Sequence, residues 1–551
     1  MKRDDAPLTR LSRRAVIGGL ASAGCVATGR PARANPSGSI RIDDAAPGTA
    51  ISPWVYGSNE IGTMDGGAPS ATLDRTAGIR ARRLGGDLMT TYNWVNNASN
   101  AGKNYQHANG AFLLEVLGIP LSEWNRPAAV IEAMHDASLA MGAVSLVTVP
   151  IAGFVAADTW GVVSPKEAAP SSRFVPVKWE RGPSAADPID ARSADIPQMI
   201  SRLIARYGDA KSGRGITAFE LDNEPGLWAE THPRIVRKPA AVGPLIERSI
   251  TAATAIKALD PSALVFGPAS WGATEMVNFV NAPDWAKYRH HGSFLDAYLA
   301  AFREASDRAG IRLLDALDVH WYPFLHREGL SRTENPFHDA TLLNAPRSLT
   351  EPGFREDSWV SAALPAGPSK GVSLPLLPSL AAITARSYPG TSIAITEFNY
   401  GGAARLASGL ALADALGRFG ATGVLFASHW GSLAGWLNEA YRLYRTPDSF
   451  GEAFGDRALP IDGVTKSGFA AFASRSSGNP ERVQLIVINK STEPVPVDAA
   501  FARGRTLRLT EVIGFDAATP QATRLNEDAT SVDGAVRLNI PARAARRFVF
   551  Q

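Results

Sequence analysis

The sequence predicts an α/β protein: a (β/α)8 TIM barrel with a small antiparallel β-sandwich domain formed from both chain ends. Three observations support this prediction. Eight short, mostly apolar strands alternate with helical segments over residues 53–450. Each strand ends in polar or aromatic residues, as expected where a barrel has its binding face. Over residues 451–551, strands follow one another without helices between them.

The barrel strands are expected where short apolar runs end in polar or aromatic residues, at 54–60, 82–87, 145–150, 219–224, 264–271, 316–323, 393–397 and 423–430. Apolar residues at helical spacing predict the intervening helices at 128–141, 196–207, 239–259, 294–309, 374–387 and 404–419. Three connections, 88–126, 153–193 and 324–372, are long, and each follows the carboxyl end of a strand. Because barrels bind substrate at that end, we expect these connections to form the walls of a cleft.

The C-terminal domain is expected to contain strands at 468–474, 483–489, 506–512 and 546–550. Residues 35–52 are expected to contribute an N-terminal strand to it, because residues 39–43 alternate between apolar and polar side chains. We expect this domain to pack against the barrel.

Residues 1–34 are expected to be a twin-arginine-type signal peptide. Ser-Arg-Arg at 12–14 precedes a weakly hydrophobic run, and Ala-Arg-Ala at 32–34 allows cleavage before Asn35. The run is too short to span a membrane, so we expect export to the periplasm or the cell exterior. A lipoprotein anchor at Cys25 is the alternative. Cys25 is the only cysteine, so the processed chain would contain no disulfide.

The charge and motif content exclude several other classes. The formal net charge is +3, but residues 1–34 hold seven basic and two acidic side chains, so the remainder carries −2. Nucleic-acid binding is therefore not expected. No metal-binding motif is evident, and the adjacent His290 and His291 are expected to point apart on regular structure. The sequence shows neither a phosphate-binding glycine loop nor Ser, His and Asp residues in the chain order of a catalytic triad.

Two barrel strands end in a glutamate that is followed by a glycine-bearing turn. Residues 218–228 read AFELDNEPGLW and contain Glu224, and residues 392–402 read SIAITEFNYGG and contain Glu397. A retaining glycosidase needs two such carboxyl groups about 5–5.5 Å apart. One protonates the leaving oxygen and the other attacks the anomeric carbon. Glu224 and Glu397 are thus the candidate catalytic pair, although either residue alone is also consistent with a solvated charge or a helix cap.

Four motifs make the chain resemble glycoside hydrolase family 44, which comprises retaining endoglucanases and xyloglucanases with a (β/α)8 barrel and a sandwich made from both chain ends. The motifs are YNWVNNASNAG at 92–102, ELDNEP at 220–225, DVHWYP at 318–323 and TEFNYGG at 396–402. The resemblance covers most of residues 40–550. It implies that Glu224 is the acid/base and Glu397 the nucleophile. It also implies that no cofactor is required and that a structural calcium is possible, without assigning its ligands.

The chain departs from the family's pattern at three positions. The family generally has Asn where this chain has Asp87, Glu where it has Val95 and Trp where it has Tyr105. These departures leave the glutamate pair unchanged but bear on the identity of the polysaccharide.

Three polar side chains are expected to assist the pair. Asn223, beside the acid, is placed to hydrogen-bond the 2-hydroxyl of the sugar at the cleavage point. His320 and Tyr322 alternate on one face of a strand, so both can point into the cleft. We expect Tyr322 to donate to Glu397 and His320 to lie nearer Glu224; a satisfied barrel-top histidine is the alternative for His320.

Aromatic and amide side chains near strand ends are candidate substrate contacts. Indoles offer flat platforms for the C–H face of a pyranose, and we expect some of five to contact sugar: Trp94, Trp228, Trp271, Trp321 and Trp430. Tyr92 and four asparagines are further candidates: Asn93, Asn96, Asn97 and Asn100. About half of these asparagines are expected to stabilise the loop instead of binding sugar.

Together these features predict a secreted, monomeric, retaining endo-β-1,4-glycosidase that hydrolyses a plant-type β-glucan such as cellulose or xyloglucan. Within the enzyme class, the alternative is a related barrel hydrolase that acts on mannan, xylan or arabinofuranosides. A non-hydrolytic sugar-binding barrel protein is the alternative from another class, although the presence of both carboxylates argues against it. For the sandwich, independent sugar binding is the alternative to a packing role.

Overall fold

A computed structural model describes residues 38–59, 70–180, 184–323, 339–365, 367, 369–445, 452–463, 468–502, 507–527, 529–532 and 535–551. Ser37–Gln551 forms one compact unit. The expected signal peptide at 1–34, with Cys25, lies outside the described residues. Within the described ranges, no helix has both the length and the apolar character needed to cross a membrane.

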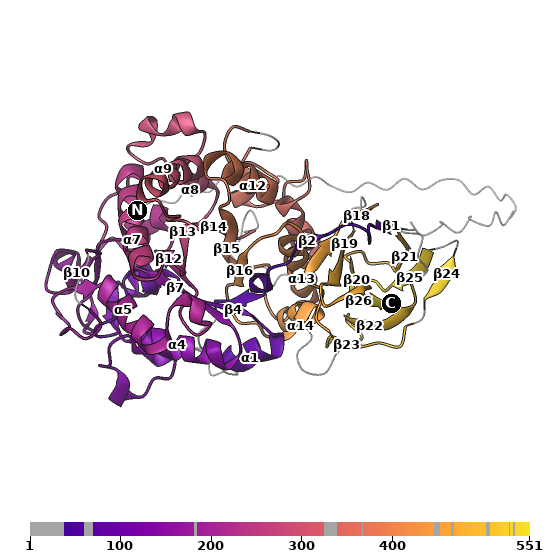
Figure 1. Cartoon of the computed structure of the whole chain (residues 1–551), viewed down its shortest axis with the longest axis horizontal. Helices are drawn as coiled ribbons and strands as arrows, with labels where there is room; N and C mark the ends of the chain where they lie inside the picture. The colour runs from indigo at the N-terminus through magenta and orange to yellow at the C-terminus, as the bar shows by residue number, and fades with distance from the viewer. Residues whose placement is uncertain are drawn as a thin grey trace, which may run out of the picture. The chain divides into compact units, whose positions relative to one another are not determined.

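Eight parallel strands close into a barrel, which confirms the predicted fold class (Figure 1). In chain order they are β3 Gly57–Ser58, β4 Ala81–Leu84, β7 Val144–Val149, β12 Ala218–Leu221, β13 Leu264–Ser270, β14 Ala316–Trp321, β15 Ser392–Phe398 and β16 Phe426–His429. Each strand pairs with the next, and β16 closes the ring on β3. Because all eight strands run in the same direction, their carboxyl ends share one face of the barrel.

The first barrel strand is shorter than the predicted 54–60. A 3-10 helix at Pro53–Val55 takes its place, because the hydroxyl of Ser52 accepts a hydrogen bond from the Trp54 amide and Pro53 occupies the first helical position. In the described part of the predicted strand, up to residue 59, the strand register pairs Gly57 and Ser58 with the neighbouring strands.

Helices cover the outside of the barrel (Figure 1). Six lie where helices were predicted: α4 Ala129–Ala140, α5 Ile196–Tyr207, α7 Val242–Leu259, α9 Phe294–Ala309, α12 Leu376–Ser387 and α13 Leu406–Ala421. The prediction missed α1 Ser70–Ala77 and α14 Gly435–Arg445. In α14 the buried side chains Leu437, Tyr441 and Tyr444 recur at helical spacing.

The long connections contain structure of their own. The first and second share a three-stranded sheet of β5 Ser99–Asn100, β6 Ala108–Gly110 and β9 Gly161–Val162, and the second also forms a sheet of β8 Phe154–Ala156, β10 Phe174–Lys178 and β11 Ala194–Asp195. Short helices lie in or at the start of the first and third long connections, α2 Asp87–Thr90, α3 Phe112–Val116, α10 Asp339–Asn344 and α11 Trp359–Ala362, and two more follow β12 and β13, α6 Trp228–Thr231 and α8 Ala273–Asn278.

The remaining strands form two facing sheets around a separate core that contains Ile40, Leu485 and Phe548. One sheet has the order β18-β1-β21-β25-β24 and the other β2-β17-β19-β20-β26-β22-β23. Their bounds are β1 Gly38–Ile42, β2 Thr49–Ala50, β17 Arg457–Leu459, β18 Ile461–Asp462, β19 Phe469–Ser476, β20 Asn479–Asn489, β21 Val495–Phe501, β22 Leu509–Phe515, β23 Thr523–Arg524, β24 Thr530–Val532, β25 Ala535–Ile540 and β26 Ala544–Phe550.

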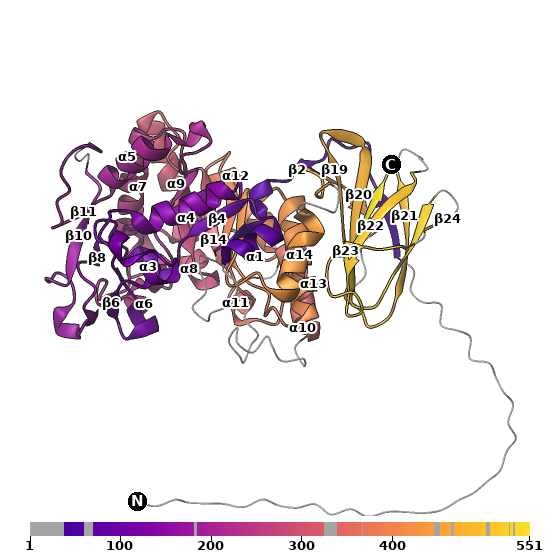
Figure 2. The ribbon, with the colours of Figure 1, turned by 90° about the horizontal axis from the view of Figure 1, so that it is seen from below.

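The N-terminal segment enters the sandwich as predicted, and Figure 2 shows its indigo strand among the yellow C-terminal ones. It contributes to both sheets, since β1 pairs with β21 and β2 pairs with β17. The β1–β21 pair is parallel. The prediction of an antiparallel sandwich is therefore wrong for this one pair of strands. The prediction also missed β21 and β25, which pair with each other in the five-stranded sheet.

A buried charge cluster joins the sandwich to the barrel. Lys490, just after β20, forms an ion pair with Asp414 of helix α13. Arg418, one turn further along α13, donates from Nε to Oδ1 of Asp414 at 2.8 Å. Phe472 of β19 packs against Gly417, where a Cβ atom would lie 2.3 Å from the ring. These contacts agree with the expected packing role of the sandwich.

Candidate active site

Glu224 stands in a sharp turn at the carboxyl end of β12. Asp222 and Glu224 both have left-handed backbone conformations, with φ of 67° and 45°. Such strain is costly outside glycine and persists where surrounding contacts hold it. The carboxylate of Asp222 supplies these contacts by accepting from the amides of Ile151 at 2.5 Å and Ala152 at 3.0 Å. The Glu224 amide itself donates to the carbonyl of Ala269 at 3.0 Å.

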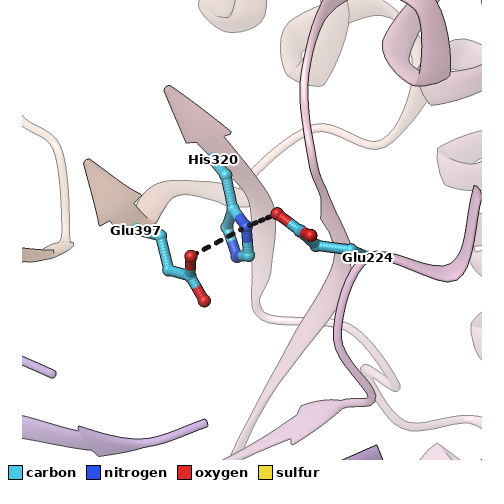
Figure 3. Close-up of side chains that lie close together, drawn as sticks. All are labelled: Glu224, His320 and Glu397. Atoms are coloured by element: carbon cyan, nitrogen blue, oxygen red, sulfur yellow. Dashed lines mark hydrogen bonds and ion pairs between the residues drawn. The ribbon is translucent and has the colours of Figure 1, made fainter. Parts of the chain in front are cut away.

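The two candidate carboxylates face each other across His320 (Figure 3). Glu397 lies on β15, and the register pairs its backbone with His320 on β14. Nδ1 of His320 is 2.8 Å from Oε1 of Glu224 and 3.6 Å from Oε2 of Glu397. One oxygen of each carboxylate and one ring nitrogen of His320 all lie within 4.8 Å of one another. The expectation that His320 lies nearer Glu224 is therefore confirmed.

Both oxygens of Glu397 accept hydrogen bonds from buried donors. The hydroxyl of Tyr322 donates to Oε2 at 2.7 Å, as predicted from the alternation of strand β14. Nη1 of Arg83 donates to Oε1 at 2.7 Å. Burial raises the pKa of Tyr322 well above its ordinary value, and the Glu397 charge raises it further. The phenol therefore stays protonated and remains a donor at all physiological pH values.

Arg83, on β4, organises the floor of the site, and the sequence prediction missed this role. Its side chain is fully buried. Besides Glu397, it donates from Nε to Glu220 at 2.7 Å, from Nη2 to Oδ1 of Asn223 at 2.8 Å and from Nη1 to Oδ1 of Asn59 at 3.0 Å. Burial alone would lower the pKa of Arg83, but the charges of Glu220 and Glu397 outweigh it and raise the pKa. One fixed guanidinium thus orients both the carboxylate Glu397 and the amide Asn223.

The environments of the two carboxylates differ as acid and nucleophile require. Burial raises the pKa of Glu224 above its ordinary value, and the charges of Glu397 and Asp87 add to the shift while His320 opposes it. Glu224 is therefore favoured in its protonated form. Glu397, by contrast, accepts from a guanidinium and a phenol, and both donors stabilise an ionised carboxylate.

Asp87 is a third carboxyl group at the site. Its Oδ2 accepts from Nδ2 of Asn104 at 2.9 Å and its Oδ1 from Nδ2 of Asn223 at 3.3 Å. Nε2 of His232 lies 4.0 Å from Oδ1. Burial, together with the Glu397 charge, raises the pKa of Asp87 to about 6. Asn223 is thus held at one end by Arg83 and at the other by Asp87.

Two adjoining cavities form the cleft. The first, of about 540 Å³, contains Glu224 and Glu397 and is lined by Asn223, Tyr322, Trp271 and Trp430, among others. The second, of about 680 Å³, is lined by Tyr105 and Phe112 from the first long connection. Gly86, Asp87, Asn104 and Trp430 line both cavities, so the space is continuous along this wall. The expectation that long connections build cleft walls is confirmed for residues 88–126.

Five predicted substrate contacts are instead buried and line neither cavity: Tyr92, Asn93, Trp94, Trp228 and Trp321. The four aromatic side chains pack in the barrel's hydrophobic core and offer a sugar no face. For these five residues the prediction is corrected. Of the predicted tryptophan platforms, Trp271 and Trp430 do line the cleft.

The asparagines of the 92–102 motif hold the loop rather than face the cleft. The amide of Asn93 donates to the carbonyl of Ala156, and that of Asn96 to Ala157. Asn97 accepts from the hydroxyl of Tyr92 at 2.6 Å and donates to two backbone carbonyls. Asn100 donates to His107. The motif is a scaffold for the first cleft wall.

In the part of the chain that the structure describes, the only group of three or more His, Cys, Asp or Glu donor atoms close enough to share an ion is Glu224, His320 and Glu397. A histidine between two carboxylates does not resemble the six to eight oxygen ligands of calcium. The structural calcium that the resemblance makes possible therefore stays a prediction without assigned ligands. The rings of His290 and His291 lie 4.1 Å apart, so the expectation that they point apart is wrong: both sit in one 3-10 turn rather than on regular structure.

Comparisons with known proteins agree with this geometry. The profile of Glycoside hydrolase family 44 matches residues 90–324. Endoglucanase A of Paenibacillus lautus is 36% identical over 502 residues, which cover 88% of this chain and 69% of that protein. Beta-mannanase/endoglucanase A of Caldicellulosiruptor saccharolyticus is 35% identical over 518 residues, 91% of this chain, although the chain spans only 38% of that relative's length.

Similarity extends to solved structures. A Paenibacillus polymyxa xyloglucanase from this family, solved with xyloglucan, matches with a TM-score of 0.84 and 33% identity. The match covers 93% of this chain and 99% of the xyloglucanase chain, so it includes both the barrel and the sandwich.

Proposed function

The chain belongs to glycoside hydrolase family 44, and on this basis we propose that it is a retaining endo-β-1,4-glucanase acting on a plant-type β-glucan such as xyloglucan or cellulose. The observation that carries the proposal is the convergence of Glu224, His320 and Glu397 within 4.8 Å in a cleft at the carboxyl face of the barrel. Inverting enzymes keep their carboxyl groups about 6.5–9.5 Å apart to admit a water, and the approach of one oxygen of each carboxylate to within 4.8 Å of the other supports retention instead. The endoglucanase and xyloglucanase relatives support the substrate class.

In the proposed reaction, Glu224 gives its proton to the glycosidic oxygen as Glu397 attacks the anomeric carbon. Burial raises the pKa of Glu224, which favours the protonated form that an acid needs. Arg83 and Tyr322 hold Glu397 in one orientation, so that little reorganisation is needed on attack. Glu224, now ionised, then removes a proton from the water that releases the sugar.

His320 and Asn223 assist without changing roles between the two steps. Nδ1 of His320 is 2.8 Å from Glu224 and holds its carboxyl group toward Glu397. The amide of Asn223 is fixed by Arg83 and Asp87 and faces the same cavity, where we propose that it hydrogen-bonds the sugar's 2-hydroxyl.

Azide rescue tests the two roles separately. With an activated aryl β-glycoside, the Glu397→Ala enzyme plus azide should form the α-glycosyl azide, because azide attacks directly from the nucleophile's side. The Glu224→Ala enzyme should form the β-azide through the glycosyl-enzyme. Glu304→Gln, on an exposed carboxylate of α9, is the control and should keep wild-type activity. Undiminished hydrolysis by either alanine variant would refute the assignment.

The polysaccharide itself is identified by a substrate panel. Xyloglucan and a soluble cellulose derivative such as hydroxyethyl cellulose should be cleaved internally, with a rapid fall in viscosity for each new reducing end. Mannan belongs in the panel because the Caldicellulosiruptor saccharolyticus relative is named a beta-mannanase as well as an endoglucanase. Preferred cleavage of mannan would replace the glucan assignment while leaving the two carboxylates in their roles.

We further propose that residues 1–34 direct export through a twin-arginine route. Support comes from the paired arginines, the weakly hydrophobic run and the Ala-Arg-Ala site. The exported protein should begin at Asn35, and changing Arg13 and Arg14 together to lysine should retain the full-length precursor in the cell. Processing that leaves Cys25 as the first residue would indicate a lipoprotein instead.

A further inference from the structure

Trp160 is the most exposed large hydrophobic side chain in the described part of the chain, at 79%. It lies in the second long connection, directly before strand β9. A single exposed apolar side chain is common on protein surfaces and needs no special explanation. Trp160 differs from such side chains in two respects. A buried ion pair holds its loop, and strand pairing joins that loop to the wall of the cleft.

The scaffold is an ion pair between Arg173 and Asp158, each only 8% exposed. Arg173 donates to both carboxylate oxygens of Asp158, at 2.7 and 3.0 Å. The same guanidinium donates to the carbonyl of Gly161 at 3.0 Å and to that of Val162 at 3.3 Å. The amide of Trp160 donates to Asp158 at 2.9 Å. The side chains of Arg173 and Asp158 therefore hold the backbone of residues 160–162, while the Trp160 side chain is exposed to solvent.

This loop is continuous with the wall of the cleft. Strand β9 pairs with β6, with Val162 opposite Ala108 and Gly161 opposite Asn109. Asn109 also donates to the carbonyl of Arg173 at 2.9 Å, which locks the two connections together. The segment carrying β6 also presents Tyr105 and Phe112, whose rings meet edge to face and line the larger cavity. The segments that flank this small sheet thus carry both the aromatic cleft wall and Trp160, which lines neither of the two cavities.

We propose that Trp160 is a platform for a β-linked glucan chain outside the catalytic cleft. The indole is flat and amphipathic and has only two side-chain torsions, and its loop is already held, so stacking a pyranose on it loses little conformational entropy. A long substrate held there and in the cleft gains affinity through two linked contacts, whereas a short one cannot reach both. The inference rests on the proposed function, since it takes the substrate to be a β-glucan polymer.

The test measures binding and hydrolysis with Trp160→Ala, Trp160→Tyr and Leu121→Ala. Leu121 is the control because it is also exposed, at 74%, in the first long connection. Binding is measured by affinity electrophoresis in gels containing xyloglucan or hydroxyethyl cellulose, with Glu397→Gln in every chain to prevent turnover. We expect Trp160→Ala to bind the polymer about two- to tenfold more weakly, and Trp160→Tyr to restore most of the affinity.

Hydrolysis separates this site from the cleft. In the active enzyme, Trp160→Ala should raise KM on the polymer but leave kcat/KM on a short aryl cello-oligosaccharide within twofold of wild type. Unchanged polymer binding, or an equal loss on short and long substrates, overturns the proposal. Self-association of the wild type that Trp160→Ala abolishes would show a protein interface instead. If the wild type neither binds nor cleaves any β-glucan, the proposed function fails as well; if it cleaves them and Trp160→Ala behaves like wild type, only this inference fails.

Discussion

The phenol of Tyr322 donates to Oε2 of Glu397 at 2.7 Å, while neither group is appreciably exposed to water. A hydrogen bond to a charged, buried carboxylate contributes about 1.5–3 kcal/mol. We therefore expect Tyr322→Phe to lower kcat/KM by about 10- to 100-fold. Steady-state kinetics on a soluble β-glucan measures the loss, and an unaltered thermal midpoint would show that it is not a folding defect. Wild-type kinetics in this variant would mean that Arg83 alone suffices to position Glu397.

Asp87 should influence the alkaline limb of the pH–activity profile. Its charge is one of the factors that raise the pKa of Glu224, after burial and the charge of Glu397. Removing the charge in Asp87→Asn should lower the pKa of Glu224, so the enzyme should lose its protonated acid at lower pH than wild type. The pH dependence of kcat/KM measures this shift. An alkaline limb that stays in place would show that Asp87 is not ionised near Glu224 or that Glu224 is not the acid.

The same substitution has a predictable effect on stability. The pKa of Asp87 rises from 3.8 to about 6 in the folded chain, so the folded state binds its proton more tightly than the unfolded state does. Stability from this group is fully present below pH 4 and is lost as pH rises to 6, by up to about 3 kcal/mol. Asp87→Asn should therefore gain stability relative to wild type at pH 7 and show no gain at pH 4. Thermal midpoints at the two pH values provide the measurement, and an equal difference at both would contradict the raised pKa.

The barrel strands and the glutamate pair were predictable because both depend on local patterns. A buried parallel strand is a short apolar run, and a polar residue at its end lies on the binding face wherever the strand stands in the ring. Glu224 and Glu397 could therefore be named without knowing which strands are neighbours. Tyr322 followed from the same local rule, because it lies two residues after His320, directly past the end of β14.

Arg83 and the buried aromatic residues were not predictable in this way. The residues of β4 are all buried, so no alternation indicates which arginine faces the barrel interior. Only the closed ring brings Arg83 next to Glu220 and Glu397, which lie 137 and 314 residues away. Trp94 and Trp228 likewise follow strand ends, yet the packing of the connections turns both into the core. An aromatic residue beyond a strand can face the core or the cleft, and tertiary contacts decide which.

Arg83→Lys should separate the guanidinium's geometry from its charge. Lysine keeps a positive charge but cannot reach Glu220, Glu397 and Asn223 with one planar fork. We expect a fall in kcat/KM of about 100-fold or more, since both Glu397 and Asn223 lose a fixed donor. Arg82→Lys is the matched control, because Arg82 pairs with Asp74 at 3.1 Å and contacts neither carboxylate of the pair. A similar loss of activity in both variants would assign the effect to the strand rather than to Arg83.

Asp414 should be the residue on which the junction of barrel and sandwich depends most. It is fully buried between Arg418 and Lys490, whose charges outweigh burial and lower its pKa. Asp414→Asn leaves the buried Lys490 without its anion and Arg418 with Glu351 as its remaining carboxylate partner, so we expect unfolding to become easier by about 3–5 kcal/mol. The exposed pair Asp498–Arg537 in the sandwich is the control, and Asp498→Asn should cost less than about 1 kcal/mol.

Because the pKa of Asp414 is lowered, its contribution to stability is present at neutral pH and lost on acidification. The difference in unfolding free energy between Asp414→Asn and wild type should therefore narrow as pH falls below 4. Urea unfolding at pH 7 and pH 3.5 measures both effects, and a loss at pH 7 no larger than that of Asp498→Asn would show that the cluster does not stabilise the junction.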